Sequence, residues 1–222
     1  MQLTPNLHAF LWSSAAANNC NTYLIRSAEK TILIDPGHAP HFDHVRRGLD
    51  ELKIPLDAVD LILCTHAHPD HIEAVRLFDG KPALFALHEA EWALVEEMAP
   101  VLKASMDLDL EPFRPDFFLS EGKMAVGEVA LEVYHTPGHA PGAVTLYWPE
   151  QKALFTGDLI FKDGLGRTDL PGGNGRQLKE SIRRIAGLNA EWLLPGHGPV
   201  VSGAAAVKAN FEQVERMWFG YV

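Results

Sequence analysis

The segment from Thr65 to His71 constrains this chain more than any other stretch, because three histidines and one aspartate lie within six residues. It reads Thr-His-Ala-His-Pro-Asp-His, and imidazole nitrogens and carboxylates are the ligands that zinc and similar divalent ions prefer. Histidines that only form hydrogen bonds in a loop are the plainer interpretation. Ligand spacing of this kind is the rarer arrangement, so it favours a metal site.

The surroundings of this segment explain its spacing. The apolar residues 61–64 before it are typical of a buried strand, and residues 70–78 after it have the spacing of a helix. His66 and His68 are two apart, so an extended backbone points them the same way. The helix turns Asp70 and His71 back towards the strand end. One strand-loop-helix corner is therefore predicted to offer ligands to two ions from two sides.

Strands and helices are predicted to alternate along the whole chain, which favours an α/β architecture. Further strands are predicted at 7–12, 21–26, 31–34, 83–86, 129–134, 143–147, 153–155 and 191–194. Further helices are predicted at 41–53, 88–98, 176–186 and 204–218. Residues 100–116, with prolines at 100, 112 and 115, are predicted to be a loop, serving either as a lid or substrate wall or as a plain surface excursion. No linker or low-complexity stretch interrupts the chain, so we expect a single domain with two halves of similar element order, about 1–116 and 117–222.

Charge and hydropathy argue against a nucleic-acid or membrane partner and say little about the small-molecule substrate that we expect. The formal charge of −10 excludes the basic stripe of a nucleic-acid surface and binding to anionic lipid. No apolar run approaches the ~20 residues of a membrane span, and no signal peptide is apparent, so we expect a cytoplasmic protein. The aromatic residues 217–222 are expected to pack on the core rather than against a second subunit, although a homo-oligomer remains open.

Three more predicted strands end in a potential ligand, namely His139, Asp158 and His197, and each has glycine directly before it. Working sites in open α/β sheets collect at strand ends, and glycine lets the backbone turn sharply there. Together with the 66–71 cluster, these positions favour one site over three unrelated turns. Asp35, before Pro-Gly, is expected either to form a turn or to orient a metal-bound histidine. Three further histidines are predicted to be surface residues, since no carboxylate or cysteine partners them at ligand spacing: His38, His41 and His44.

The sequence resembles the metallo-β-lactamase superfamily over nearly its whole length, from Asn21-Thr22-Tyr23-Leu24 and Leu33-Ile34-Asp35-Pro36-Gly37 to Pro195-Gly196-His197-Gly198. The resemblance implies a four-layer αββα sandwich with a dinuclear site at one edge. By motif position, the first ion would be held by His66, His68 and His139. The second would be held by Asp70, His71 and His197, and Asp158 would bridge both. The family usually has glycine soon after the Asp-His pair, whereas this chain has Glu73 there. Glu73 is expected either to alter packing at the helix start or to place a carboxylate at the pocket edge.

Within this superfamily, residues 157–161 and 166–173 look like the glyoxalase II-like branch. The implied activity is hydrolysis of a thioester or ester by a hydroxide that two divalent ions make available at neutral pH, with zinc favoured and iron or manganese as alternatives. Asp70 would also orient that hydroxide. Arg167 is expected either to grip a substrate anion or to form a salt bridge with Asp169. The thiol or alcohol that carries the acyl group stays open. Glyoxalase II has an additional C-terminal helical domain that helps hold glutathione, whereas the residues after His197 in this sequence suffice for one helix.

Three alternatives to this hydrolase stay open. The Gly-Arg-Thr-Asp element is also similar to persulfide dioxygenases, which would use a single iron on His66, His139 and Asp158. A lactonase or β-lactamase would use the same site with different substrate walls. A metal-stabilised binding protein without turnover is the third, and the retention of all seven ligand positions argues against it.

Overall fold

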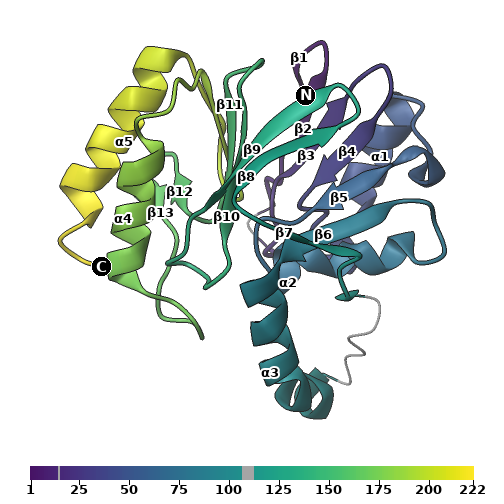
Figure 1. Cartoon of the computed structure of the whole chain (residues 1–222), viewed down its shortest axis with the longest axis horizontal. Coiled ribbons are helices and arrows are strands. Elements are labelled where there is room, and N and C mark those ends of the chain that lie inside the picture. The colour runs from purple at the N-terminus through teal and green to yellow at the C-terminus, as the bar shows by residue number, and fades with distance from the viewer. Residues whose placement is uncertain (15, 107–112) are drawn as a thin grey trace. The chain divides into compact units, whose positions relative to one another are not determined.

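The computed structural model describes residues 1–14, 16–106 and 113–222. The chain forms two compact units, Met1–Leu119 and Ser120–Val222, which Figure 1 colours from purple to teal and from green to yellow. The boundary at 119 lies close to the predicted one at 116. That the two units behave as a single domain stays a prediction.

The first unit is built on a seven-stranded sheet whose spatial order follows the chain. Its strands are β1 (Gln2–Thr4), β2 (Leu7–Phe10), β3 (Thr22–Arg26), β4 (Thr31–Ile34), β5 (Leu61–Leu63), β6 (Leu84–His88) and β7 (Phe117–Leu119). Strands β1 to β4 pair antiparallel, whereas β4 to β7 pair parallel. The register places Ile34 beside Leu63, so the residues that follow β4 and β5 emerge at the same sheet edge.

Helices connect the parallel strands of this unit, because a parallel pair needs a crossover. They are η1 (Ala39–His41), α1 (Asp43–Glu51), η2 (Leu56–Ala58), α2 (Pro69–Ile72), η3 (Glu73–Phe78) and α3 (Glu89–Met106). Helix α1 buries Val45 and Leu49 in a core cluster that also holds Leu33, Ile62 and Phe85 from the sheet. Phe42 is buried in the same cluster, so the helix predicted at 41–53 packs an apolar face on the sheet.

The second unit has a six-stranded sheet in the order β15-β14-β11-β10-β9-β8. These strands are β8 (Gly122–Val126), β9 (Val129–His135), β10 (Val144–Trp148), β11 (Ala153–Gly157), β14 (Trp192–Pro195) and β15 (Val201–Ser202), and β12 (Ile160–Phe161) and β13 (Gly164–Leu165) form a separate ribbon. Helices α4 (Gly175–Ile185) and α5 (Ala204–Trp218) lie on one face of the sheet (Figure 1). They bury Leu178, Ile182 and Phe211 against sheet residues such as Leu154 and Leu193.

Most predicted elements are confirmed to within a few residues, and α5 begins and ends where expected. The six strands that sequence reasoning missed are β1, β7, β8, β15 and the ribbon pair β12 and β13. All but the ribbon pair are the outermost strands of their sheets. An edge strand has a solvated side and a short length, so it lacks the apolar run by which a central strand is recognised.

The predicted loop at 100–116 is wrong in its first part, since α3 continues through Pro100 to Met106. Proline disfavours a helix interior, but the alanine, leucine, lysine and methionine residues around it are strong helix formers. Strand β7 then begins at Phe117. The lid or substrate wall expected within this segment falls on residues 107–112, which lie outside the described residues.

Of the C-terminal aromatic residues, Phe219 packs on the core as expected, whereas Trp218 and Tyr221 are exposed, at 39% and 84%. Phe219 contacts the second core cluster, and Trp218 donates a hydrogen bond from Nε1 to the Asp163 carbonyl oxygen at 2.7 Å. Among the described residues, no helix combines the length and apolar character needed to span a membrane.

Candidate metal centre

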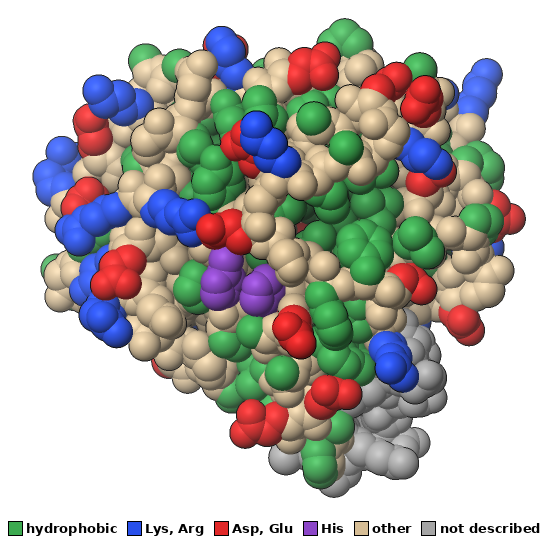
Figure 2. Space-filling model, viewed as in Figure 1, with side chains coloured by type: hydrophobic (Ala, Val, Ile, Leu, Met, Phe, Trp, Pro, Cys, Tyr) green, Lys and Arg blue, Asp and Glu red, His purple; other side chains and the backbone are tan. Residues whose placement is uncertain are grey.

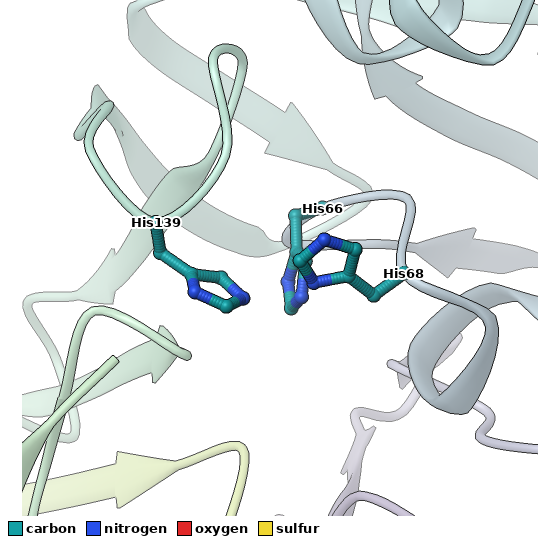
Figure 3. A group of neighbouring side chains, drawn as sticks. All are labelled: His66, His68 and His139. Carbon is teal, nitrogen blue, oxygen red and sulfur yellow. The ribbon is translucent and has the colours of Figure 1, made fainter. Parts of the chain in front are cut away.

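The loop between β5 and α2 carries four of the predicted ligands. His66, Asp70 and His71 are buried and His68 is half-buried. The rings of His66 and His71 are 4.0 Å apart, and those of His66 and His68 meet edge to face at 4.7 Å (Figure 3). Ligand atoms of His66 lie within 4.8 Å of those of His68 and of His71, and the same holds for Asp70 with His71. The first unit therefore gathers its predicted ligands at one point.

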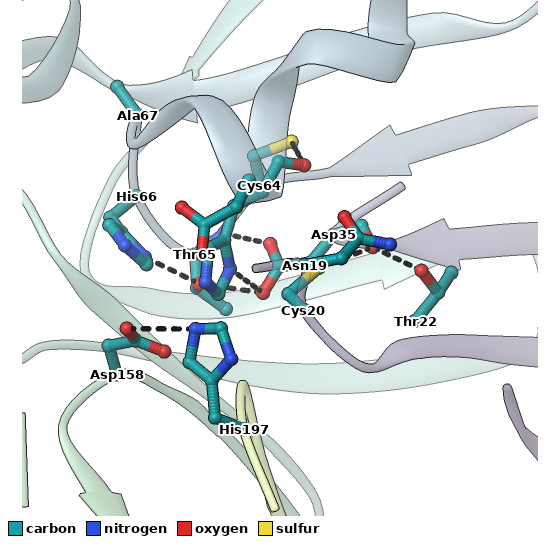
Figure 4. Close-up of polar contacts among 12 residues, drawn as sticks. Asn19, Cys20, Thr22, Asp35, Cys64, Thr65, His66, Ala67, Asp158 and His197 are labelled. Atoms are coloured by element: carbon teal, nitrogen blue, oxygen red, sulfur yellow. Dashed lines mark hydrogen bonds and ion pairs between the residues drawn. The ribbon is translucent and has the colours of Figure 1, made fainter. Parts of the chain in front are cut away.

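Asp35 organises this loop from the end of β4 (Figure 4). Its Oδ1 accepts the backbone N–H of Thr65 at 2.7 Å, and its Oδ2 accepts the Thr65 hydroxyl at 2.8 Å. The same Oδ2 lies 3.0 Å from Nδ1 of His71. Of the two roles expected for Asp35, this contact favours orienting a histidine.

These contacts also select which ring nitrogen of each histidine is available as a ligand. The Thr65 hydroxyl donates its proton to a hydrogen bond with Asp35. The hydroxyl oxygen is therefore left to accept a hydrogen bond from Nδ1–H of His66, 3.1 Å away. Asp35 does the same for Nδ1 of His71. A histidine held through Nδ1–H presents Nε2 as its basic nitrogen, the tautomer that metal-binding histidines need.

Asp70 is held by a residue that sequence reasoning missed. Nδ2 of Asn18 donates to its Oδ2 at 2.7 Å, and the Asp70 backbone oxygen accepts the N–H of Cys20 at 3.3 Å. Both partners come from the polar turn that precedes β3. No local signal marks Asn18, because 52 positions separate it from Asp70.

The second unit brings its three predicted ligands to one sheet edge. Strands β9 and β11 are both antiparallel to β10, and β14 is parallel to β11, so β9, β11 and β14 run in the same direction. His139, Asp158 and His197 follow these three strands at their carboxyl ends. Oδ2 of Asp158 lies 3.6 Å from Nε2 of His139 and 3.3 Å from Nε2 of His197 (Figure 4). A carboxylate between two imidazoles suits the bridging role that the resemblance implies.

The turn that carries His139 is packed so closely that only glycine fits beside it. Gly138 has φ +139, and a Cβ there would lie 2.2 Å from the backbone nitrogen of Leu178 in α4. Nδ1 of His139 lies 2.7 Å from the carbonyl oxygen of Arg167. The carbonyl oxygen accepts a hydrogen bond from Nδ1–H, so the proton stays on Nδ1 and Nε2 faces Asp158.

The side chain of Arg167 forms the salt bridge that was one of its two expected roles. Nε and Nη2 contact the two oxygens of Asp169 at 2.7 and 2.6 Å. Both side chains are largely exposed, at 61% and 67%. Hydrogen bonding from the guanidinium lowers the pKa of Asp169 to about 2. The contact of Arg167 with a substrate anion stays a prediction.

Glu73 contacts His38, one of the three histidines that precede or begin helix α1. His38, His41 and His44, which the sequence predicts to be surface residues, are half-buried. Nδ1 of His38 lies 2.7 Å from Oε2 of Glu73, a partner too remote in sequence for ligand spacing to reveal. Glu73 also contacts Nη2 of Arg76 at 3.2 Å, which favours the packing role for this departure from the family pattern.

The chemistry of these side chains fits divalent ions, because neutral imidazole nitrogens and carboxylates converge within each unit. The cysteines offer no competing nucleophile. Cys20 and Cys64 are fully buried, and burial raises the pKa of the Cys64 thiol well above its usual value.

Comparison with known proteins agrees with this geometry. A family model for the metallo-β-lactamase superfamily matches residues 15–197. The hydroxyacylglutathione hydrolase GloC of Haemophilus influenzae is 31% identical over 204 residues, which cover 89% of this chain and 93% of GloC. The B3 metallo-β-lactamase BLEG-1 is 30% identical with a TM-score of 0.70, covering 89% of this chain and 91% of its own.

A third relative, TTHA1623 in a di-iron-bound form, is 32% identical with a TM-score of 0.70, covering 89% of this chain and 92% of its own. The predicted α/β fold class is confirmed by these likenesses, and the histidine and aspartate clusters fit divalent metal ions. This chain belongs to the metallo-β-lactamase superfamily.

Proposed function

We propose that this protein is a dinuclear metal-dependent hydrolase that cleaves a thioester or ester, as glyoxalase II does. The proposal assigns one ion to His66, His68 and His139, a second to Asp70, His71 and His197, and the bridging position to Asp158. The observation that carries it is the shared orientation of the histidines. Nδ1 of His66, His71 and His139 each meets an oxygen of the protein, so that Nε2 is the basic nitrogen.

The relatives support this assignment. GloC is named a hydroxyacylglutathione hydrolase, and the bound form of TTHA1623 contains two iron ions. An imidazole-rich set with two carboxylates suits zinc or iron, so we propose zinc as the first candidate, with iron or manganese as alternatives. BLEG-1, a B3 metallo-β-lactamase, favours a β-lactam as the second substrate class to test.

The residues of this chain divide the work of hydrolysis between them. The ions would lower the pKa of a water towards ~7 and polarise the substrate carbonyl. Asp70, whose carboxylate is oriented by Asn18, would accept a hydrogen bond from the attacking water and aim its lone pair at the carbonyl carbon. A thiol leaving group has a pKa of ~8.5 and departs as a thiolate without a general acid. A thioester therefore fits this site, because every predicted ligand is a histidine or an aspartate that would hold metal and the leaving thiolate needs no additional general acid.

The surface is in keeping with a small-molecule substrate. On the described part of the face in Figure 2, acidic side chains lie beside the basic ones. The formal charge of the chain is −10. We propose a cytoplasmic enzyme without a nucleic-acid or membrane partner, and gel filtration with light scattering tests whether it forms a homo-oligomer.

The decisive experiment combines metal analysis with a substrate panel. Protein stripped of metal and reloaded with zinc, iron or manganese is assayed on a hydroxyacyl thioester, a carboxylate ester, a lactone and a β-lactam. Oxygen uptake is followed with glutathione persulfide. We expect two equivalents of metal per chain and hydrolysis of the thioester or ester, with the stripped protein inactive. Loaded protein that cleaves neither would refute the proposal, and oxygen uptake with one equivalent of iron would replace it with persulfide dioxygenation.

A further inference from the structure

Glu91, in the first turn of α3, is a buried carboxylate that no sequence motif singled out. Only 1% of its surface is exposed, whereas its neighbour Glu89 in the same turn is exposed. A glutamate is almost never fully buried unless it is paired, because burial of a carboxylate without hydrogen bonds is costly. The burial of Glu91 therefore directs attention to what its oxygens contact.

Oε2 of Glu91 accepts the backbone N–H of Ala67 at 2.8 Å, across 24 positions of sequence. Ala67 is the residue between His66 and His68. The start of a helix is also where backbone N–H groups and the helix dipole favour a negative charge. The carboxylate thus joins the first turn of α3 to the middle of the histidine loop.

A second buried carboxylate holds the same loop one step earlier. Oδ1 of Asp35 accepts the backbone N–H of Thr65 at 2.7 Å. The N–H groups on both sides of His66 therefore end on carboxylates, one after β4 and one at the start of α3. The Ala67 N–H lies in the peptide plane that joins His66 to Ala67, so its hydrogen bond fixes the plane on the carboxyl side of His66, whereas the Thr65 N–H fixes the plane that precedes Thr65.

We propose that Glu91 is a positioning residue that sets the spacing of His66 and His68, and this role rests on the metal centre proposed above. Without the Glu91 acceptor, the half-buried loop at Ala67 loses the hydrogen bond that fixes the peptide plane between His66 and Ala67. His66 would keep its contact with Thr65, but the step from His66 to His68 would be free to rotate. Metal affinity should fall while the rest of the fold persists.

The test compares zinc affinity in three variants by competition with a chelator. Glu91→Ala removes the acceptor and is expected to weaken zinc binding about 10- to 100-fold, as loss of a contact behind a metal ligand typically does. Glu91→Gln keeps a carbonyl oxygen for Ala67 and is expected to stay within about 3-fold of the unmodified protein, since a neutral acceptor is weaker but present. Glu89→Ala makes the same change of charge at the exposed neighbour and should leave affinity unchanged.

A measurement on metal-free protein separates this inference from the proposed function. Hydrogen exchange of the Ala67 amide should be slow in the stripped unmodified protein and in Glu91→Gln, and fast in Glu91→Ala. If the alanine variant does not fold, Glu91→Asp replaces it, because its carboxylate is shorter by one methylene and falls short of Ala67. Unchanged zinc affinity in Glu91→Ala, or an equal loss in Glu89→Ala, would overturn the positioning role. Unmodified protein that binds zinc but cleaves nothing would refute the proposed function alone.

Discussion

A methyl group added at Gly166 tests how tightly two of the proposed ligands are held. Its Cβ would lie 1.8 Å from the carbonyl oxygen of Asp158 and 3.1 Å from Nδ1 of His139. Carbon and oxygen atoms approach to ~3.3 Å at closest, so the backbone at 158 or 166 must move by about 1.5 Å. The contact from Nδ1 of His139 to the Arg167 oxygen is 2.7 Å long and tolerates only ~0.5 Å before it is lost.

We therefore expect Gly166→Ala to displace His139, Asp158 or both. Loss of the contact behind a metal-binding histidine weakens metal affinity about 10- to 100-fold, which corresponds to ~1.4–2.7 kcal/mol. Overpacking of this kind destabilises a fold by ~1–3 kcal/mol. Chelator competition measures the first quantity, and chemical unfolding of the metal-free protein measures the second.

Gly164→Ala is the matched control, two residues earlier in β13. A Cβ at Gly164 meets only Cδ2 of Phe161, at an ordinary 3.9 Å. This variant should bind metal and unfold as the unmodified protein does. Metal affinity that is unchanged in Gly166→Ala, or reduced equally in both variants, would refute the reasoning that links Gly166 to the ligands.

Three further predictions concern single side chains. Asp158→Ala should lower metal content and abolish activity while the far-ultraviolet circular dichroism stays unchanged, and full activity would remove Asp158 from the site. Arg167→Ala should raise the KM for an anionic thioester, and Asp169→Ala should lower it by releasing the guanidinium from its salt bridge; an unchanged KM in both would exclude Arg167 from substrate binding. Burial, together with its hydrogen bond to Glu132, raises the pKa of Tyr134 to about 12, above its usual value of 10.0. The folded state thus holds this proton more tightly, so the resulting stability is complete below pH 10 and is lost as the pH rises towards 12. Between pH 10 and pH 12, the free energy of unfolding measured with denaturant should fall less steeply in Tyr134→Phe than in the unmodified protein. Equal slopes in the two proteins would contradict the raised pKa of Tyr134.

The predicted ligands could be read from the chain because each is marked locally. His66, His68, Asp70 and His71 lie in one short loop whose spacing is itself the signal. His139, Asp158 and His197 each follow an apolar strand and a glycine. Central strands and amphipathic helices were recognisable for a similar reason, since burial imposes a periodicity on their residues.

Other features had no local mark. Edge strands such as β1 and β8 owe their conformation to the strand beside them, and their residues carry no strong pattern of their own. The continuation of α3 through Pro100 depends on the helix formers around it outweighing a single unfavourable residue. A reading based on residue type alone places a break there.

The order of residues along the chain was enough to establish the family and to predict the ligands and the strand ends on which they lie. It left open whether Asp35 contacts a histidine, and it did not reveal that this histidine is His71, that Asn18 holds Asp70, or that Glu91 holds Ala67. Each of these hydrogen bonds joins residues between 24 and 52 positions apart. Such partners meet only because strand order and helix packing bring separate segments together, and folding alone creates that proximity.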